Sequence, residues 1–260
     1  MIELKNLTRR FGDLAAVDGV SLNIPAGQIC GYLGPNGAGK TTTVKMLTGM
    51  IRPTAGTATI SGYDIQQDDL EVKRRIGFVP ESGALYQSLT PLEYLRFIGL
   101  LYEMDERKIT RRINEFCDFF QITENIHQRM TEFSKGMKQK VVIASAMLHN
   151  PQVIFLDEPL NGLDANTALL LKELIRNLAD DGKTIFYCSH ILDVVENLCD
   201  RVVIIDKGKI VADGSVDQLK EMTKRSSLEG VFSELTHAED LGELAKAFSK
   251  SITKEETHNS

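Results

Sequence analysis

The sequence lacks three features that would each assign it to a different class of protein. It has no run of about 18 apolar residues, which predicts no membrane span, and residues 1–10 contain no apolar signal region. Its formal net charge of −6 offers no basic field, so we expect no nucleic-acid partner. Its four cysteines are far apart and show no CxxC spacing, which indicates a reduced, cytoplasmic compartment.

Short apolar runs alternate with helical patterns over 260 residues, enough for one main domain. This alternation predicts an α/β fold with a mixed sheet and flanking helices. Residues 2–7 and 17–24 have no room for a helix between them, which indicates an antiparallel β subdomain. The clearest strands of the main sheet are expected at 28–33, 76–80, 153–156, 184–188 and 202–206.

Between Pro80 and Pro151 the strand patterns give way to helical ones. Thr90 and Glu93, with a proline after Thr90, are typical of a helix start, since the hydroxyl and the carboxylate can cap each other's backbone N–H groups. We therefore expect a helical subdomain at about 82–150, inserted into the α/β domain.

The main domain is expected to span residues 1–222. Residues 223–260 are rich in Lys, Glu and Ser, and they form a C-terminal extension that we expect to be partly disordered. A short apolar patch lies within it at 228–235.

The strongest chemical motif is a glycine-rich P-loop between an expected strand and an expected helix. We expect it to bind nucleotide through Gly34, Pro35, Asn36, Gly37, Ala38, Gly39, Lys40, Thr41 and Thr42. Glycines allow backbone N–H groups to turn toward phosphates, and the helix N-terminus adds positive potential. Lys40 is expected to reach the outer phosphates, and the Thr41 hydroxyl to bind Mg²⁺. The alternative is a glycine-rich turn that matches by chance, which the strand–loop–helix context disfavours.

Two adjacent carboxylates, Asp157 and Glu158, end an apolar strand at its C-terminal end, where open α/β sheets bind ligands. Neighbouring strand residues point in opposite directions. We expect Asp157 to hold the metal and Glu158 to act as the general base. A strand capped by a solvated acidic turn is the alternative.

With both motifs in place, residues 1–215 resemble the ATP-binding-cassette (ABC) family. Three further segments carry the resemblance: the signature-like Ser134, Lys135, Gly136 and Met137, the D-loop ending at Asp164, and the switch-like His190. The resemblance implies that His190 contacts the γ-phosphate, whereas taken alone it would be an ordinary histidine at a strand end.

The resemblance also implies two partners. Ser134 begins a helical pattern and can cap it, which creates a second anion site, although an ordinary capped helix is the alternative. In the family this surface closes over the ATP of a second cassette, identical or different. The other partner is a membrane permease. Its docking surface is expected at Ala84, Leu85, Tyr86 and Leu89, an apolar cluster whose alternative is local core.

The sequence departs from the family pattern at several positions. Glu81 stands where many members have Gln, and it is expected to bind magnesium. Lys135 replaces a glycine of the signature, Met137 replaces its glutamine, and Asn161 replaces a D-loop serine. Phe11 lies where the family has an aromatic that stacks on adenine, although a core or turn role is the alternative.

These departures and residues 227–236 resemble the bacterial branch of drug, antibiotic-peptide and sodium exporters. For residues 227–236 the alternative is a generic amphipathic docking segment. We therefore expect an ATP-binding and ATP-hydrolysing subunit, with ATP and Mg²⁺ as cofactors, at the cytoplasmic face of the membrane. It would drive a separate permease through ATP-dependent cassette dimerisation. The alternative is a soluble ABC-type ATPase, which the single P-loop and the short helical insertion disfavour.

Overall fold

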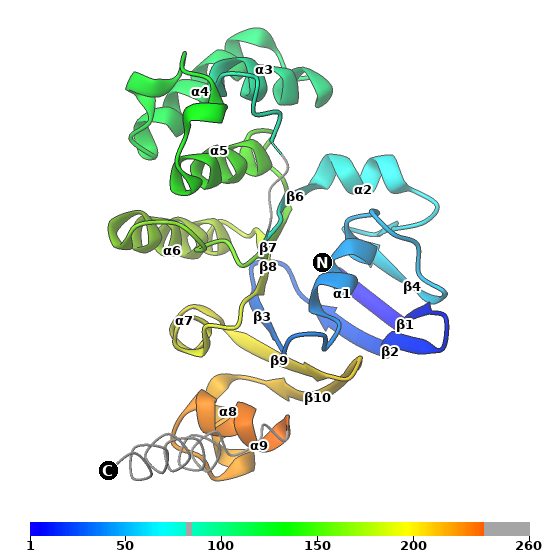
Figure 1. The fold of residues 1–260 in the computed structure, drawn as a ribbon. Coiled ribbons are helices and arrows are strands. Elements are labelled where there is room, and N and C mark those ends of the chain that lie inside the picture. Colours follow the sequence, from blue (N-terminus) through cyan, green and yellow to red (C-terminus); the bar gives the residue numbers. More distant parts are fainter. Residues whose placement is uncertain (82–84, 237–260) are drawn as a thin grey trace, which may run out of the picture.

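The structure, a computed structural model, describes residues 1–81 and 85–236. Two β-sheets lie at its centre, and helices cover the larger sheet (Figure 1). The predicted α/β fold is confirmed, with the antiparallel strands forming a sheet of their own.

The larger sheet has six strands and carries most of the predicted motifs. In spatial order they are β10 (Lys209–Gly214), β9 (Arg201–Asp206), β3 (Ile29–Leu33), β8 (Thr184–Cys188), β7 (Val153–Asp157) and β6 (Ile76–Val79). β10 pairs with β9 antiparallel and the other neighbours pair in parallel, so the sheet is mixed as predicted. Every residue of β3, β7 and β8 is buried, which explains their continuous apolar runs.

The five predicted strands of this sheet are confirmed, with ends displaced by one residue at most. β10 was not predicted. It is an edge strand whose apolar run is only three residues long, Ile210 to Ala212, and of these only Ala212 is buried.

The smaller sheet is entirely antiparallel. Its strands, in spatial order, are β2 (Leu14–Ile24), β1 (Ile2–Phe11), β4 (Ala55–Ile60) and β5 (Tyr63–Asp64). In β1, Ile2 and Leu4 are buried while Lys5 is exposed, as expected for a sheet with one covered face. The two N-terminal strands are confirmed, and β4 and β5 are additional.

Alternate residues of one strand face two different hydrophobic cores. In β7, Val153 and Phe155 belong to the core shared with the smaller sheet, whereas Ile154 and Leu156 belong to the core on the other face. The helices around these cores are α1 (Lys40–Leu47), α2 (Asp69–Arg75), α6 (Ala165–Asp180) and α7 (Leu192–Leu198). The larger sheet is thus buried between two layers, and polar groups are concentrated at its strand ends.

A helical region lies between β6 and β7 in sequence and projects from the sheet (Figure 1). It contains α3 (Pro91–Leu101), α4 (Glu106–Phe119), α5 (Lys135–Met147) and 3₁₀ turns at Thr123–Asn125 and Met130–Glu132. The predicted cap is present, since Thr90 Oγ1 accepts the N–H of Glu93 (3.2 Å) and Glu93 Oε2 accepts the N–H of Thr90 (2.9 Å).

The C-terminal part that the structure describes forms two short helices, α8 (Val216–Thr223) and α9 (Leu228–Leu235), and α9 packs against α7. The apolar patch predicted at 228–235 is therefore a helix on the core. Residues 237–260 of the predicted extension lie outside the described residues.

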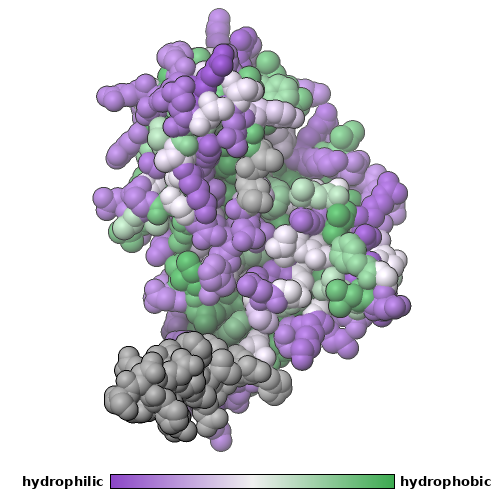
Figure 2. All heavy atoms as spheres, viewed as in Figure 1, coloured by the Kyte–Doolittle hydropathy of each residue, from purple (hydrophilic) through white to green (hydrophobic). Residues whose placement is uncertain are grey.

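The four cysteines are buried and unpaired. Within the described residues, no helix has the length and apolar character required to cross a membrane. Figure 2 shows the apolar side chains on one face of the molecule as separate areas within a largely polar surface.

Candidate functional site

The glycine-rich loop connects β3 to α1, and two of its glycines lie where no larger residue fits. Gly39 has a φ of 111°, and a Cβ atom there would lie 2.3 Å from the carbonyl oxygen of Ala16. A Cβ atom at Gly34 would lie 2.4 Å from the carbonyl oxygen of Ile205. These close approaches allow the tight curve in which backbone N–H groups can bind an anion.

Lys40 and Thr41 form the first turn of α1. Lys40 Nζ donates hydrogen bonds to the carbonyl oxygens of Gly34 (2.6 Å) and Pro35 (3.1 Å), so the ammonium lies within the curve of the loop. The Thr41 hydroxyl donates to Asp157 Oδ2 at 3.3 Å. The loop is thereby linked to the end of β7.

Asp157 and Glu158 lie where β7 ends, and they are 2% and 6% exposed. Glu158 has a φ of 51°, which is uncommon for a residue with a side chain, and its N–H donates to the carbonyl oxygen of Cys188 at 2.9 Å. The two carboxylates have different partners, although Glu158 lies just beyond the end of β7 and strand alternation does not apply to it. Asp157 contacts Thr41, and Glu158 contacts the segment that follows β8.

The carboxylate of Glu158 is held on both oxygens. Oε1 accepts the backbone N–H of His190 (2.8 Å) and contacts its ring Nδ1 (2.6 Å), while Oε2 accepts the Ser189 hydroxyl (3.0 Å). Because an ionised carboxylate only accepts, Nδ1 carries the hydrogen in this contact, and Nε2 remains for a ligand. The His190 side chain is 62% exposed, so a ligand can reach it.

Asp157, Thr41 and Glu81 together offer oxygen ligands of the kind that a small divalent cation prefers. Burial, and after it the charge of Glu81, raises the pKa of Asp157 to about 6, although the Thr41 hydroxyl favours the ionised form. A cation would relieve this unfavourable environment. No group of three or more His, Cys, Asp or Glu in the described ranges could hold a metal ion. Mg²⁺ is commonly bound by one or two carboxylates plus phosphate oxygens.

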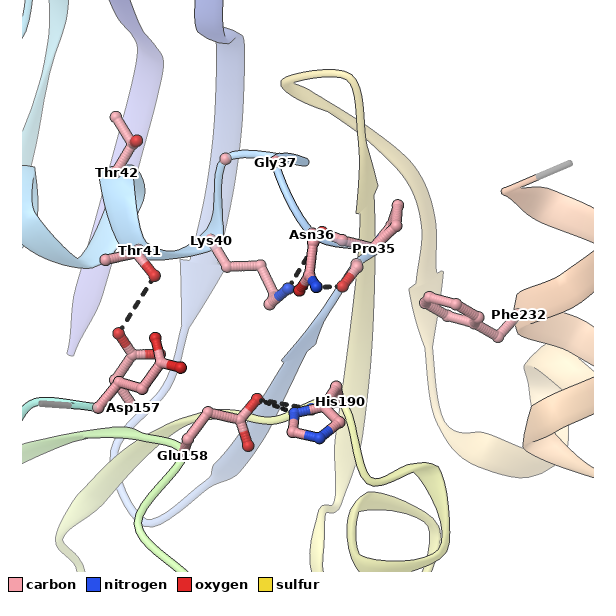
Figure 3. Close-up of a pocket in the computed structure, with 13 residues that line it drawn as sticks. Pro35, Asn36, Gly37, Lys40, Thr41, Thr42, Asp157, Glu158, His190 and Phe232 are labelled. Atoms are coloured by element: carbon pink, nitrogen blue, oxygen red, sulfur yellow. Dashed lines mark hydrogen bonds and ion pairs between the residues drawn. The ribbon is translucent and has the colours of Figure 1, made fainter. Parts of the chain in front are cut away.

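These side chains share one pocket of about 570 Å³, shown in Figure 3. This volume lies within the usual range for small-molecule sites. The predicted residues that line it are Gly34, Pro35, Asn36, Gly37, Gly39, Lys40, Thr41, Thr42, Glu81, Asp157, Glu158 and His190. Ala38 is 3% exposed and lies behind the loop. The tertiary structure thus brings together four segments that are far apart in sequence.

The signature-like segment is elsewhere. Ser134 caps α5, its hydroxyl accepting the N–H of Met137 at 3.2 Å, and neither residue lines the pocket. A Cβ atom on Gly136 would lie 2.6 Å from the carbonyl oxygen of Gly162, so this segment packs directly on the D-loop. The anion site predicted at Ser134 is therefore separate from the residues that line the nucleotide pocket of its own chain.

The D-loop ends in a helix cap. Asp164 Oδ1 accepts the backbone N–H of Thr167 (2.9 Å), and Oδ2 accepts its hydroxyl (2.6 Å). These hydrogen bonds lower the pKa of Asp164. Lys140 of α5 lies 4.0 Å from the same carboxylate, which links the D-loop to the helix of the signature-like segment.

Phe11 does not line the pocket. It ends β1, it is 49% exposed, and the Arg9 guanidinium lies 4.6 Å from the centre of its ring. Adenine stacking on Phe11 stays a prediction.

Phe232 of α9 lines the pocket and was not predicted to do so. The sequence did carry a signal, since Leu228, Val231, Phe232 and Leu235 have helical spacing. Nothing in that spacing indicates which element the helix packs against.

The chain is similar to known proteins in both sequence and structure. The profile of the family described as ABC transporter matches residues 17–161. The ATP-binding protein NatA of Bacillus subtilis is 39% identical over 238 residues, covering 89% of this chain and 96% of NatA. The linearmycin resistance ATP-binding protein LnrL of the same organism is 36% identical over 219 residues, covering 84% of this chain and 70% of LnrL.

Solved structures give the same result. A structure of the ATP-binding subunit of an ABC transporter superposes with a TM-score of 0.86 at 32% identity, covering 91% of this chain and 99% of that one. The ATP-binding cassette MJ0796, a dimer bound to ADP and Pi in a post-hydrolysis state, superposes with a TM-score of 0.75 at 28% identity. That match covers 83% of this chain and 98% of MJ0796.

Proposed function

The chain belongs to the ABC transporter family as an ATP-binding and ATP-hydrolysing subunit, and from this premise we propose which residues do the chemistry and which partners complete the transporter. The observation that carries the proposal is the hydrogen-bonding of Glu158, a nearly buried carboxylate held by His190 and Ser189 inside the P-loop pocket. A fixed carboxylate at this place is suited to proton abstraction from water.

In the proposed mechanism the loop N–H groups and the Lys40 ammonium bind the phosphates of ATP. Glu158 accepts a proton from the attacking water, and His190 orients the carboxylate through Nδ1 and its backbone N–H. His190 Nε2 is the ring nitrogen that does not contact Glu158. A hydrogen bond from Nε2 to a phosphate oxygen requires a proton on that nitrogen, and therefore an imidazolium while Nδ1 keeps its own.

Thr41, Asp157 and Glu81 would hold Mg²⁺. When bound, the ion supplies positive charge against the negative phosphate oxygens. Glu81 lines the pocket with the other two, which supports its assignment as a ligand despite the glutamine found at this place in many family members.

A second cassette is proposed to complete the site. Ser134 and Met137 do not line the pocket of their own chain, and Lys135 contacts the D-loop through Gly162. The anion site at the start of α5 is thus available to a nucleotide held by another subunit. This arrangement supports a head-to-tail pair in which two nucleotides lie between two subunits.

The permease is proposed to dock beside the helical region. Tyr86 is 63% exposed and Phe97 is 41% exposed, and their rings meet edge to face with centroids 6.0 Å apart. Tyr94, which also contacts Tyr86, lines an adjoining groove of about 260 Å³ together with Phe78 and Ile98. An aromatic surface beside a groove suits the apolar face of a short helix.

Leu85 and Leu89 of the predicted docking cluster are half-buried and packed against the core. These two residues therefore fit the alternative that the cluster belongs to the local core. Tyr86 is the cluster residue that we propose for docking. Ala84 lies outside the described residues.

Docking on a permease would place the chain at the cytoplasmic face of the membrane. Export is the proposed direction of transport, supported by the likeness to LnrL, whose name gives it a role in linearmycin resistance. The test is to purify the full chain with its bound partners from a detergent extract. Co-purification of a polypeptide with several membrane spans, together with Mg-ATP hydrolysis, is expected. A stable complex with a ribosome or DNA-repair assembly instead would favour the soluble-ATPase alternative.

A further inference from the structure

Helix α9 brings a side chain to the nucleotide pocket from the C-terminal part of the chain. Phe232 lines the pocket together with Pro35 and His190, and Figure 3 shows it pointing from α9 toward them. Thr41 and Asp157 lie on the other side of the pocket in this view. Phe232 is therefore at the end where His190 is proposed to meet the terminal phosphate.

The position of Phe232 follows from the way α9 packs. Leu228 and Val231 are fully buried in the core that also contains α7. Successive helix residues are about 100° apart, so Phe232 lies at one edge of this buried face. It is half-buried, and beyond that edge is the pocket.

Glu196 of α7 ties both C-terminal helices to α7. One carboxylate oxygen forms an ion pair with Lys220 of α8, and the other accepts the N–H of Leu228 at the start of α9 (3.2 Å). The hydrogen bond from Lys220 lowers the pKa of Glu196, so the carboxylate is charged at neutral pH. A charge at this place also favours the helix N-terminus of α9.

The segment that holds Glu158 leads directly into α7. The N–H of Ile191 donates to Ser189 Oγ at 3.1 Å, and the Ser189 hydroxyl donates to Glu158 at 3.0 Å. α7 begins at Leu192, two residues after His190. A continuous set of contacts thus runs from α9 through α7 to the Glu158 carboxylate.

We propose that Phe232 is a wall of the catalytic pocket and a positioning residue for His190. Held on α7 by Glu196 and by its buried face, α9 forms one side of the pocket beside Pro35 and His190 and restrains the His190 segment. Phe232 packs against the same core as Leu228 and Val231, but unlike them it also lines the pocket. The inference rests on the proposed function, because it takes the terminal phosphate to lie beside His190.

The test is steady-state Mg-ATP hydrolysis by the full chain carrying Phe232→Ala. We expect kcat to fall about tenfold, since small losses of positioning near reacting atoms have large effects on rate. KM should stay within about threefold, because the loop and Lys40 supply most of the phosphate binding. Phe232→Tyr keeps the ring and should restore most of kcat, which a generally weakened core would not explain.

Leu235→Ala is the matched control. Leu235 belongs to the same helix and packs against the same core, but it does not line the pocket. The inference is overturned if Phe232→Ala and Leu235→Ala have the same kcat within about twofold. If Phe232→Ala unfolds at a lower temperature than Leu235→Ala, Phe232→Leu is used in its place. A kcat of Phe232→Leu within about twofold of that of Leu235→Ala then overturns the inference.

A parallel Glu158→Gln variant separates this inference from the proposed function. If Glu158→Gln loses turnover while Phe232→Ala matches the control, the role of Phe232 fails and the proposed function survives. If Glu158→Gln turns over as the unmodified chain does, the proposed function itself fails, and the inference with it.

Discussion

Glu158 and His190 are joined by two contacts on a single carboxylate oxygen, from the backbone N–H at 2.8 Å and from ring Nδ1 at 2.6 Å. They meet because β7 and β8 are parallel neighbours, with Asp157 paired to Cys188, so both chains leave the sheet at the same edge. The proposed base and the proposed switch residue are therefore fixed relative to each other by the sheet.

Glu158→Gln is expected to bind Mg-ATP but to hydrolyse it about 10²- to 10⁴-fold more slowly, the usual contribution of a positioned base. The amide oxygen can still accept the backbone N–H of His190, so the loop should keep its place while the base is lost. Nucleotide binding and turnover are measured on the same preparation. A normal hydrolysis rate would remove Glu158 from the role of base.

Lys40→Ala and Ser134→Arg chains should each be inactive alone and should regain part of the activity when mixed. The reason is that a heterodimer would contain one site with both an intact P-loop and an intact Ser134 opposite it. Activity is titrated against the ratio of the two chains, with heterodimers verified by differential tags and a hydrolysing single-site dimer as the control. If verified heterodimers stay inactive while that control turns over, Ser134 does not act on a nucleotide bound by the other chain.

Tyr86→Asp is expected to leave nucleotide binding intact, to release the chain from the membrane fraction, and to abolish transport. A carboxylate would disrupt the exposed aromatic surface of Tyr86 and Phe97 without entering the core. Met222→Asp is the matched control, since Met222 is 59% exposed on α8, away from this surface. Equal membrane association of the two variants would reject docking at Tyr86. Leu85→Asp, in contrast, should lower stability because Leu85 packs against the core.

His149 should make folding stability depend on pH. Its Nε2 bonds the carbonyl oxygen of Ile76 at 2.9 Å, its ring stacks on Tyr102, and its Nδ1 is buried with no hydrogen-bond partner among residues 1–81 and 85–236. Burial lowers the pKa of His149 from 6.5 to about 4, and the charges of Arg112 and Lys183 act in the same direction. Between pH 6.5 and pH 4 the unfolded chain binds a proton at His149 more readily than the folded chain does. The free energy of unfolding is therefore highest above pH 6.5 and falls as the pH is lowered through this range.

The expected loss from this histidine is about 1–2 kcal/mol between pH 7.5 and pH 5. His149→Gln keeps a donor for the Ile76 carbonyl but cannot titrate, so its unfolding free energy should fall less over the same range. Urea unfolding at the two pH values measures the difference. Parallel pH dependences of the two proteins would contradict the assignment.

Local sequence determined the elements that carry the motifs. β3, β7 and β8 are continuous apolar runs because both faces of the central sheet are covered, and the caps at Thr90 and Ser134 form from residues three positions apart. The glycines of the loop were readable as a P-loop motif, although the close approach to Ala16 that excludes a larger residue at Gly39 is a tertiary contact. The strands and the caps depend on burial shared by a whole strand or on interactions within a short stretch.

Only the tertiary structure decided which of these elements share a pocket. Ser134 was readable as a helix cap, but its exclusion from the pocket depends on the packing of α5 against the D-loop at Gly162. Phe232 was readable as part of an apolar helical face, but its place beside His190 depends on the contacts of α9 with α7 and Glu196. The spacing of apolar residues predicts that a helix face will be buried, but it does not predict which element covers that face. Apolar burial is non-directional, and the covering element is set by chain topology and packing.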